Sequence, residues 1–200
     1  MVPTVHFYAS PLGEIGLASN GSALTALWFQ GQRYAPALPV GWTPEQAVRC
    51  PVLAQATAWL DAYFAGKQPD FLPPLQPAGT PFRLLVWRLL QTIPHGETIT
   101  YGQLATAVAR AQGVQNMSAQ AIGGAVGHNP ISILIPCHRV VGSDGTLTGY
   151  AGGLERKKWL LDREQTAVEG VDWGADILTH TRESLSECSD KESIGNERPF

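Results

Sequence analysis

The sequence predicts an α/β domain, made of a small antiparallel sheet and one helix, followed by a mostly α-helical domain that contains a helix-turn-helix. Three observations support this fold class. Apolar residues alternate in short runs near the N-terminus, they recur at helical spacing after residue 80, and a proline-rich segment at 67–79 lies between the two patterns. We expect the α/β domain at 1–76, the helical domain at 77–165 and a polar, acidic tail at 166–200 that is partly disordered.

The N-terminal strands are predicted from alternation and from turn residues. Apolar side chains alternate over 5–9, and two further apolar runs follow at 14–18 and 24–29. The Asn-Gly pair at 20–21 is typical of a β-hairpin. Apolar residues take helical spacing over 52–64, so one helix is expected to pack on the sheet. The prolines of the following segment predict a stiff linker.

The helical domain is predicted to begin with a helix at about 81–93. Thr80 can cap its N-terminus, Pro81 suits the first helical position, and Pro94 ends it. Apolar residues between these limits recur at i, i+3, i+4, i+7 and i+8, which indicates one buried face.

Two shorter helices are expected across a tight break. Thr100 can cap a helix that runs to about residue 109, and Ser118 can cap a second that runs to about residue 128, with Gly113 between them. Such a pair resembles a helix-turn-helix, although most helix pairs in proteins bind no DNA.

The second of these helices has an unusual composition. Its small residues are Ala119, Ala121, Gly123, Gly124, Ala125 and Gly127. Each glycine inside a helix costs about 1 kcal/mol relative to alanine. Such a surface allows close approach to the backbone, either by another helix or by a nucleic-acid groove, and the composition alone does not decide between them.

The remaining segments of the helical domain follow the small-residue helix that ends at about residue 128. A buried run is expected at 131–135, a turn at 144–145 and a loop of small residues around Tyr150. A last helix is expected at 154–164.

The charge is unevenly distributed along the chain. The whole chain carries a net charge of −3, but residues 80–164 hold eight arginines and lysines against five acidic residues, a balance of +3. Residues 165–200 hold three basic and eight acidic residues. The middle of the chain can therefore present a basic face to nucleic acid, although this balance alone proves nothing.

The cysteines and the apolar runs indicate in which cellular compartment the chain is expected. Three cysteines, far apart, do not make a disulfide framework and fit a reducing compartment. No secretory signal, no membrane-spanning run and no metal-ligand spacing is visible. The chain is expected in the cytoplasm, without a membrane or metal partner.

One cysteine has neighbours that suit chemistry. Cys137 follows an apolar run and is followed at once by His138 and Arg139. A cysteine at the end of an apolar run is usually inert core, but an adjacent imidazole can take a thiol proton and a carboxylate can orient that imidazole. This pattern fits many cysteine nucleophiles, including thiol hydrolases.

The segment around this cysteine, Ile-Pro-Cys-His-Arg-Val at 135–140, resembles the signature of the O6-alkylguanine-DNA alkyltransferases, also called methylated-DNA–protein-cysteine methyltransferases, of the bacterial type. Four further segments resemble that family in the same order, namely 96–104, 123–125, 129–133 and 148–154. The resemblance implies a ribonuclease H-like fold for the first domain and a DNA-binding alkyltransferase domain for the second. It also implies a monomer without cofactor that acts on double-stranded DNA containing O6-alkylguanine, with O4-alkylthymine as a further candidate substrate.

The resemblance also implies catalytic roles. Cys137 would accept the alkyl group in a single turnover, and His138 would draw off its proton through a water. Glu164 would orient that histidine, and Asn129 would hold the turn that bears the cysteine. Tyr101 would bind the flipped guanine and protonate its ring nitrogen as the base leaves.

Substrate contacts are implied in the same way. Tyr150 would form a wall of the pocket, and the backbone around Val140 would recognise the guanine edge. The remaining expected substrate or DNA contacts are Gln120, Ala121, Gly123, Gly124, Arg139 and Gly152. A damaged base inside a duplex cannot be reached by a thiol, so it must be rotated out of the stack.

The sequence departs from the family pattern at three places. Gln120 stands where the family usually has an arginine that fills the gap left by the flipped base, so weaker stabilisation of the flipped state is expected. Ala151 stands where the family often has a serine, and the connection at 109–117 between the two short helices is longer than the family's common form. A rival hypothesis is an alkyltransferase-like protein that only binds the lesion, but such proteins lack the acceptor cysteine that Cys137 supplies.

Overall fold

Three antiparallel strands form the N-terminal sheet. In the computed structural model, which describes residues 4–37 and 50–165, β1 (Thr4–Ser10) pairs with β2 (Gly13–Ser19) and β2 pairs with β3 (Leu24–Phe29). The three predicted strands are thus confirmed. The acidic tail expected at 166–200 lies outside the described residues.

The turn between β2 and β3 is wider than a two-residue hairpin. Asn20 Oδ1 accepts hydrogen bonds from the backbone amides of Ser22 and Ala23, at 3.0 and 2.9 Å, and the Asn20 amide donates to the Ala23 carbonyl at 3.2 Å. The predicted hairpin is confirmed, and its extra residues follow from the asparagine side chain, which bonds to the backbone beyond it.

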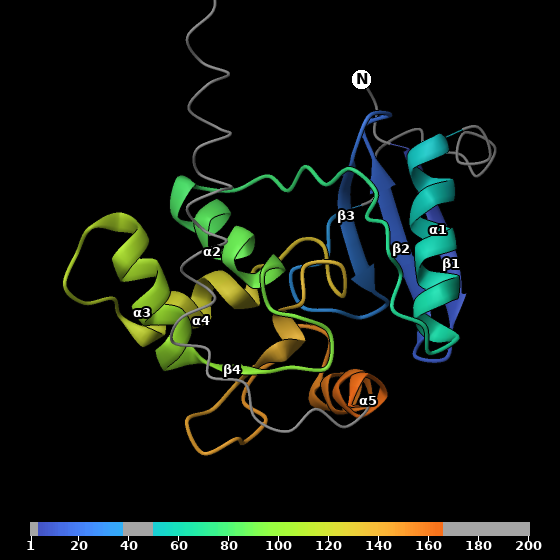
Figure 1. Cartoon of the computed structure of the whole chain (residues 1–200). Coiled ribbons are helices and arrows are strands. Elements are labelled where there is room, and N and C mark those ends of the chain that lie inside the picture. Colours follow the sequence, from blue (N-terminus) through green and yellow to red (C-terminus); the bar gives the residue numbers. More distant parts are fainter. Residues whose placement is uncertain (1–3, 38–49, 166–200) are drawn as a thin grey trace, which may run out of the picture.

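Helix α1 (Pro51–Phe64) covers one face of this sheet (Figure 1). Its apolar stripe, which includes Leu53, Ala56 and Leu60, is buried in the same core as Ile15 and Leu17 of β2. This helix was predicted from the helical spacing of its apolar residues, and its buried stripe covers the apolar side chains on that face of the sheet. We call β1–β3 and α1 the sheet unit.

The proline-rich segment is attached to the sheet instead of hanging free. The Leu24 amide donates to the Pro74 carbonyl at 2.7 Å, and the Gln76 amide donates to the Leu24 carbonyl at 2.8 Å. These bonds make Leu75 a parallel bridge partner of Leu24. The segment therefore adds a short contact to the start of β3, which its composition did not predict.

The helical unit contains α2 (Pro81–Gln91), α3 (Tyr101–Gln112), α4 (Ala119–Gly127) and α5 (Leu154–Glu164) (Figure 1). The predicted N-caps are confirmed. The side chains of Thr80, Thr100 and Ser118 each accept a backbone N–H of the first turn. Helix α3 continues three residues beyond its predicted end, to Gln112, and is capped by Gly113, which takes the left-handed conformation with φ 68°.

A two-residue parallel ladder fixes the segment that follows Cys137. Strand β4 (Ile99–Thr100) pairs with β5 (Val140–Val141), directly after the short 3-10 helix η2 (Cys137–Arg139). Pairs this short carry no periodic signal, and the sequence did not predict them. The ladder places η2 next to the start of α3.

The two units share one hydrophobic core. Residues of β3 such as Leu27 and Phe29 belong to the same buried cluster as Val86, Ile131 and Cys137. The backbone joins them too, because the Leu27 amide donates to the Pro130 carbonyl and the Ser132 amide donates to the Leu27 carbonyl, both at 2.9 Å. Strand β3 therefore holds the segment that leads to the cysteine. Within the described part of the chain, no helix combines the length and the apolar character needed to cross a membrane.

Gly16 offers a test of the outer sheet face. A Cβ at this position would overlap the Trp28 indole, which lies across the glycine. We expect Gly16→Ala to lower the free energy of unfolding by about 1–3 kcal/mol, measured by chemical denaturation. The control is Gly102→Ala, where the added carbon meets only Thr100 Oγ1 at 3.7 Å. Equal stability of the two variants would contradict the packing described for Trp28.

Candidate active site

Cys137 lies at the wall of a cavity of about 370 Å³ between the two units. It is the first residue of η2 and only 4 % exposed. Tyr101 from the start of α3 and Tyr150 from the loop before α5 line the same cavity. The structure therefore brings together three of the residues predicted to act on a substrate.

The turn before the cysteine is held by the Asn129 side chain. Its amide nitrogen lies 2.7 Å from the Ile135 carbonyl, 3.3 Å from the Ile131 carbonyl and 3.0 Å from Cys137 Sγ. Its amide oxygen accepts from the Ile131 amide at 3.0 Å. Inside this turn Ile133 has φ 67°, an uncommon conformation for a β-branched residue. Asn129 thus satisfies the buried backbone that positions the thiol.

The protonation states of the thiol and the imidazole are set by burial. Burial raises the pKa of Cys137 to about 11, although the hydrogen bond from Asn129 opposes the rise. Burial lowers the pKa of His138, against the attraction of Glu164. At neutral pH the thiol therefore keeps its proton while the imidazole is neutral and can accept one.

The orientation of His138 leaves one ring nitrogen available. Its Nε2 lies 2.8 Å from Glu164 Oε1, and a carboxylate accepts, so Nε2 carries the hydrogen. Its Nδ1 is buried and has no hydrogen-bond partner within the described residues. The free lone pair is thus on Nδ1, which suits the acceptance of a proton.

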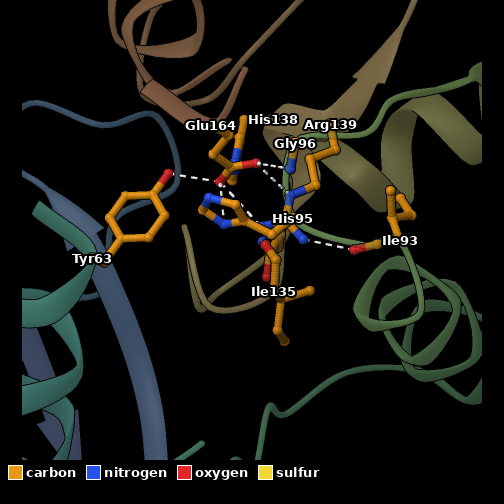
Figure 2. A network of polar contacts seen from close by, with 9 residues as sticks. Tyr63, Ile93, His95, Gly96, Ile135, His138, Arg139 and Glu164 are labelled. Atoms are coloured by element: carbon orange, nitrogen blue, oxygen red, sulfur yellow. Dashed lines mark hydrogen bonds and ion pairs between the residues drawn. The ribbon is translucent and has the colours of Figure 1, made fainter. Parts of the chain in front are cut away.

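Glu164 is the centre of a buried polar network (Figure 2). It is 1 % exposed, and its two oxygens accept from Tyr63 Oη at 2.7 Å, from His138, from Arg139 Nε at 2.7 Å and Nη2 at 3.0 Å, and from the Gly96 amide at 3.4 Å. Burial alone would raise its pKa, but His138 and Arg139 hold the pKa of this carboxyl well below its usual range. The carboxylate is therefore charged at neutral pH.

Arg139 requires a correction, because it was expected to contact substrate or DNA. Its guanidinium is buried against Glu164, and its Nη1 donates to the Ile93 carbonyl at 2.6 Å (Figure 2). A side chain used in this way is not free to bind a phosphate. Arg139 instead supplies the counter-charge that keeps Glu164 ionised.

Two residues of the site were missed by the sequence reasoning. Tyr63 belongs to the apolar stripe of α1, and nothing in its surroundings along the chain indicates that its hydroxyl reaches Glu164. Lys157 is buried, and its Nζ donates to the Val140 carbonyl at 2.6 Å and the Thr148 carbonyl at 2.9 Å. Burial lowers the pKa of Lys157 to about 8, while the nearby Cys137 favours its charged form. It fastens the loop before α5 to the residue after η2.

The two tyrosines of the cavity differ in their surroundings. Burial raises the pKa of Tyr101, so its hydroxyl stays protonated, and it donates to the Thr148 carbonyl at 3.5 Å. Tyr150 packs edge-on against Phe29 of β3, with 6.5 Å between the ring centroids. A Cβ at Gly152 would come within 2.8 Å of the Tyr150 ring, so this glycine is needed to seat the ring instead of lining the cavity. Val140 is fully buried and does not line the cavity either.

The small-residue face of α4 is open. Gln120, Ala121 and Gly124 are exposed, and a Cβ added at Gly123 or Gly124 would meet nothing within 4 Å. Within the described part of the chain, the possibility that another helix covers this face is therefore excluded. Gly123, Gly124 and Gly127 also line the cavity, so the open face continues into the site.

No group of three or more histidine, cysteine, aspartate or glutamate side chains that could hold a metal ion occurs among residues 4–37 and 50–165. The groups that the site does contain are a thiol, an imidazole, a carboxylate and two phenols. A buried thiol beside a neutral histidine and an ionised carboxylate defines a cysteine-nucleophile site. The uncovered helix face at its edge is a surface that a large partner can approach closely.

Comparison with known proteins defines the family. Residues 4–77 match the family model described as 6-O-methylguanine DNA methyltransferase, ribonuclease-like domain, and residues 81–166 match the DNA binding domain of the same description. The chain therefore belongs to the 6-O-methylguanine DNA methyltransferase family.

Individual relatives agree over most of their length. A methylated-DNA–protein-cysteine methyltransferase of Mycobacterium leprae is 46% identical over 159 residues, which are 80% of this chain and 90% of that protein. One of Haemophilus influenzae is 41% identical over 160 residues, 80% of this chain and 84% of that protein. The crystal structure of Mycobacterium tuberculosis OGT in complex with DNA superposes with a TM-score of 0.70 at 40% identity, over 82% of this chain and 93% of that one.

The Glu164 network can be tested through stability. Glu164→Gln leaves the Arg139 guanidinium buried without its counter-charge, so we expect the free energy of unfolding to fall by about 3 kcal/mol. Tyr63→Phe removes one hydrogen bond to the same carboxylate and should cost about 1 kcal/mol. Both values are measured by urea denaturation at pH 7. If the two substitutions cost the same, the charge of Glu164 is not what stabilises the network.

Proposed function

We propose that this protein repairs alkylated DNA by transferring the alkyl group of O6-alkylguanine irreversibly to Cys137. The observation that carries this proposal is the state of the thiol. It is buried and protonated, it lies beside a neutral imidazole backed by a charged carboxylate, and it faces a cavity that is continuous with an open helix face. Relatives with this chemistry in their names support the choice of reaction.

The proposed reaction is a displacement at the alkyl carbon. His138 Nδ1 takes the thiol proton, through a water, and Sγ attacks the carbon in line with its bond to O6. The C–O6 bond breaks, its electrons pass into the guanine ring, and Tyr101 donates a proton to the ring nitrogen. The imidazolium then returns the original thiol proton to the Tyr101 oxygen. The products are an S-alkylcysteine and a neutral guanine, so the protein reacts once.

The proposed substrate pose uses the open face of α4. Gly123 and Gly124 allow the backbone to approach DNA closely, and the damaged nucleotide is rotated out of the duplex into the cavity. Gln120 is exposed in the first turn of α4, where its amide can hydrogen-bond to the base left unpaired. Tyr150 forms a wall beside the flipped base.

Two other functions are less well supported. A protein that only recognises the lesion does not need a buried thiol with a proton acceptor beside it. A thiol hydrolase needs a second water and a site for an oxyanion, and neither follows from the residues around Cys137. Action as a monomer is part of the proposal, because one chain supplies every residue of the reaction. The free, buried Cys50 and Cys137 support a reducing, cytoplasmic setting.

A mass measurement tests the transfer directly. The protein is mixed with duplex DNA containing one O6-methylguanine, and its peptides are mapped. We expect one methyl group on the peptide that holds Cys137 and none in Cys137→Ala, with unmodified duplex as the control. Methylation of another residue, or turnover of more than one lesion per molecule, would contradict the proposal.

Gly124→Ala separates folding from DNA binding. An alanine in the middle of a helix is more favourable than glycine by about 1 kcal/mol, so the free energy of unfolding should rise. The added methyl group projects from the open face, so the affinity for duplex DNA should fall at least severalfold, as measured by fluorescence anisotropy. Gly145→Ala, in a turn away from the cavity, is the control for affinity alone, because its φ of 77° makes alanine unfavourable there. An unchanged affinity in Gly124→Ala means that α4 does not lie against the DNA.

A further inference from the structure

Two residues of the cavity lining, Arg33 and Tyr34, come from the segment after β3 and have no role so far. Tyr34 follows β3, lines the cavity together with Cys137, and is 54 % exposed. Tyrosine is enriched at binding surfaces because its ring offers apolar area while its hydroxyl keeps a polar contact.

The Tyr34 ring is held by two neighbours. It stacks on the His128 ring, with 4.0 Å between the centroids and 19° between the planes. The Arg33 guanidinium lies 4.8 Å from its centroid. Stacking and cation–π contacts both fix the ring plane, so Tyr34 acts as a rigid wall and not as a mobile side chain.

The backbone that carries the ring is fixed as well. Gln32 Oε1 accepts from the Phe29 amide at 3.2 Å and from Ser132 Oγ at 3.0 Å, and the Arg33 amide donates to the Ala151 carbonyl at 2.9 Å. Tyr34 itself has φ 63°, which is costly for an aromatic residue and persists only where the surroundings impose it. The segment is thus tied to β3, to the turn before Cys137 and to the loop of Tyr150.

The position of this wall relates it to the alkyl group. In the guanine ring, N3 and the carbon that bears O6 lie on opposite sides, so a base whose N3 faces Tyr101 directs its O6 substituent away from Tyr101. His128, on which Tyr34 stacks, directly precedes Asn129, whose amide nitrogen lies 3.0 Å from Cys137 Sγ. Tyr34 and Cys137 line the same cavity, so a substituent longer than methyl that extends beyond Sγ is confined by walls that include the Tyr34 ring.

We propose that Tyr34, held in place by Arg33 and His128, limits the size of the O6 substituent that the cavity accepts. This inference rests on the proposed alkyl transfer to Cys137. Methyl fits between Sγ and the ring, whereas a benzyl group meets the ring. Replacing the ring by hydrogen removes this obstacle, and glycine also accepts the positive φ without strain.

The experiment is a competition between two duplexes of one sequence, one with O6-methylguanine and one with O6-benzylguanine. The ratio of benzylated to methylated Cys137 peptide is read by mass spectrometry. Relative to the unsubstituted protein, Tyr34→Gly should raise this ratio about tenfold, the size of effect expected for added space in an apolar pocket. Tyr34→Phe keeps the ring and should leave the ratio unchanged. His128→Ala frees the ring to move and should raise the ratio, but by less than Tyr34→Gly.

The outcomes separate this inference from the proposed function. If the ratio of benzylated to methylated peptide is unchanged in Tyr34→Gly, whether both transfers slow equally or neither changes, the size limit is wrong. If the unsubstituted protein does not methylate Cys137 at all, the proposed function itself fails. Tyr34→Asn, which also tolerates positive φ, is the second variant, and the unfolding temperature of each shows that it is folded.

Discussion

The charged carboxylate of Glu164 is the interaction on which the rest of the site depends. An ionised group in a dry interior is unfavourable unless donors surround it, and here a phenol, an imidazole, a guanidinium and a backbone amide do so. Those donors come from α1, from η2 and from the segment before β4. One side chain at the end of α5 therefore fixes the relative positions of elements from both units, and the tautomer of His138 follows from the same contact.

The second constraint is the path of the chain before Cys137. Residues 130–132 are hydrogen-bonded to Leu27 of β3, and the next turn is closed by the Asn129 amide. A sheet edge on one side and a side-chain amide on the other leave η2 little freedom. The thiol gains a fixed direction in this way, and its burial keeps it protonated at neutral pH.

Local signals in the sequence predicted most of the fold. Contacts between residues far apart along the chain leave no pattern in a single sequence, so they were not predicted. The caps at Thr80, Thr100 and Ser118 act within three residues of the helix start, so they can be recognised along the chain. The β4–β5 ladder and the docking of the proline-rich segment depend on partners far along the chain, and each involves too few residues to show a period.

The residues of the candidate site also fall into those that the sequence indicates and those that only the fold shows. Cys137 and His138 were evident as neighbours, and the family resemblance supplied Glu164, Asn129 and the tyrosines. Arg139 was assigned to the substrate, and only the fold shows the buried carboxylate that it meets. Tyr63 lies 101 residues from Glu164 in the chain, so no local sequence pattern indicates their contact.

The Tyr63 hydroxyl also bears on whether the two units can fold separately. Because the sheet unit supplies one donor to this carboxylate and β3 supplies the edge that holds the turn before Cys137, the helical unit is not an independent module, and the two halves should unfold in one cooperative transition.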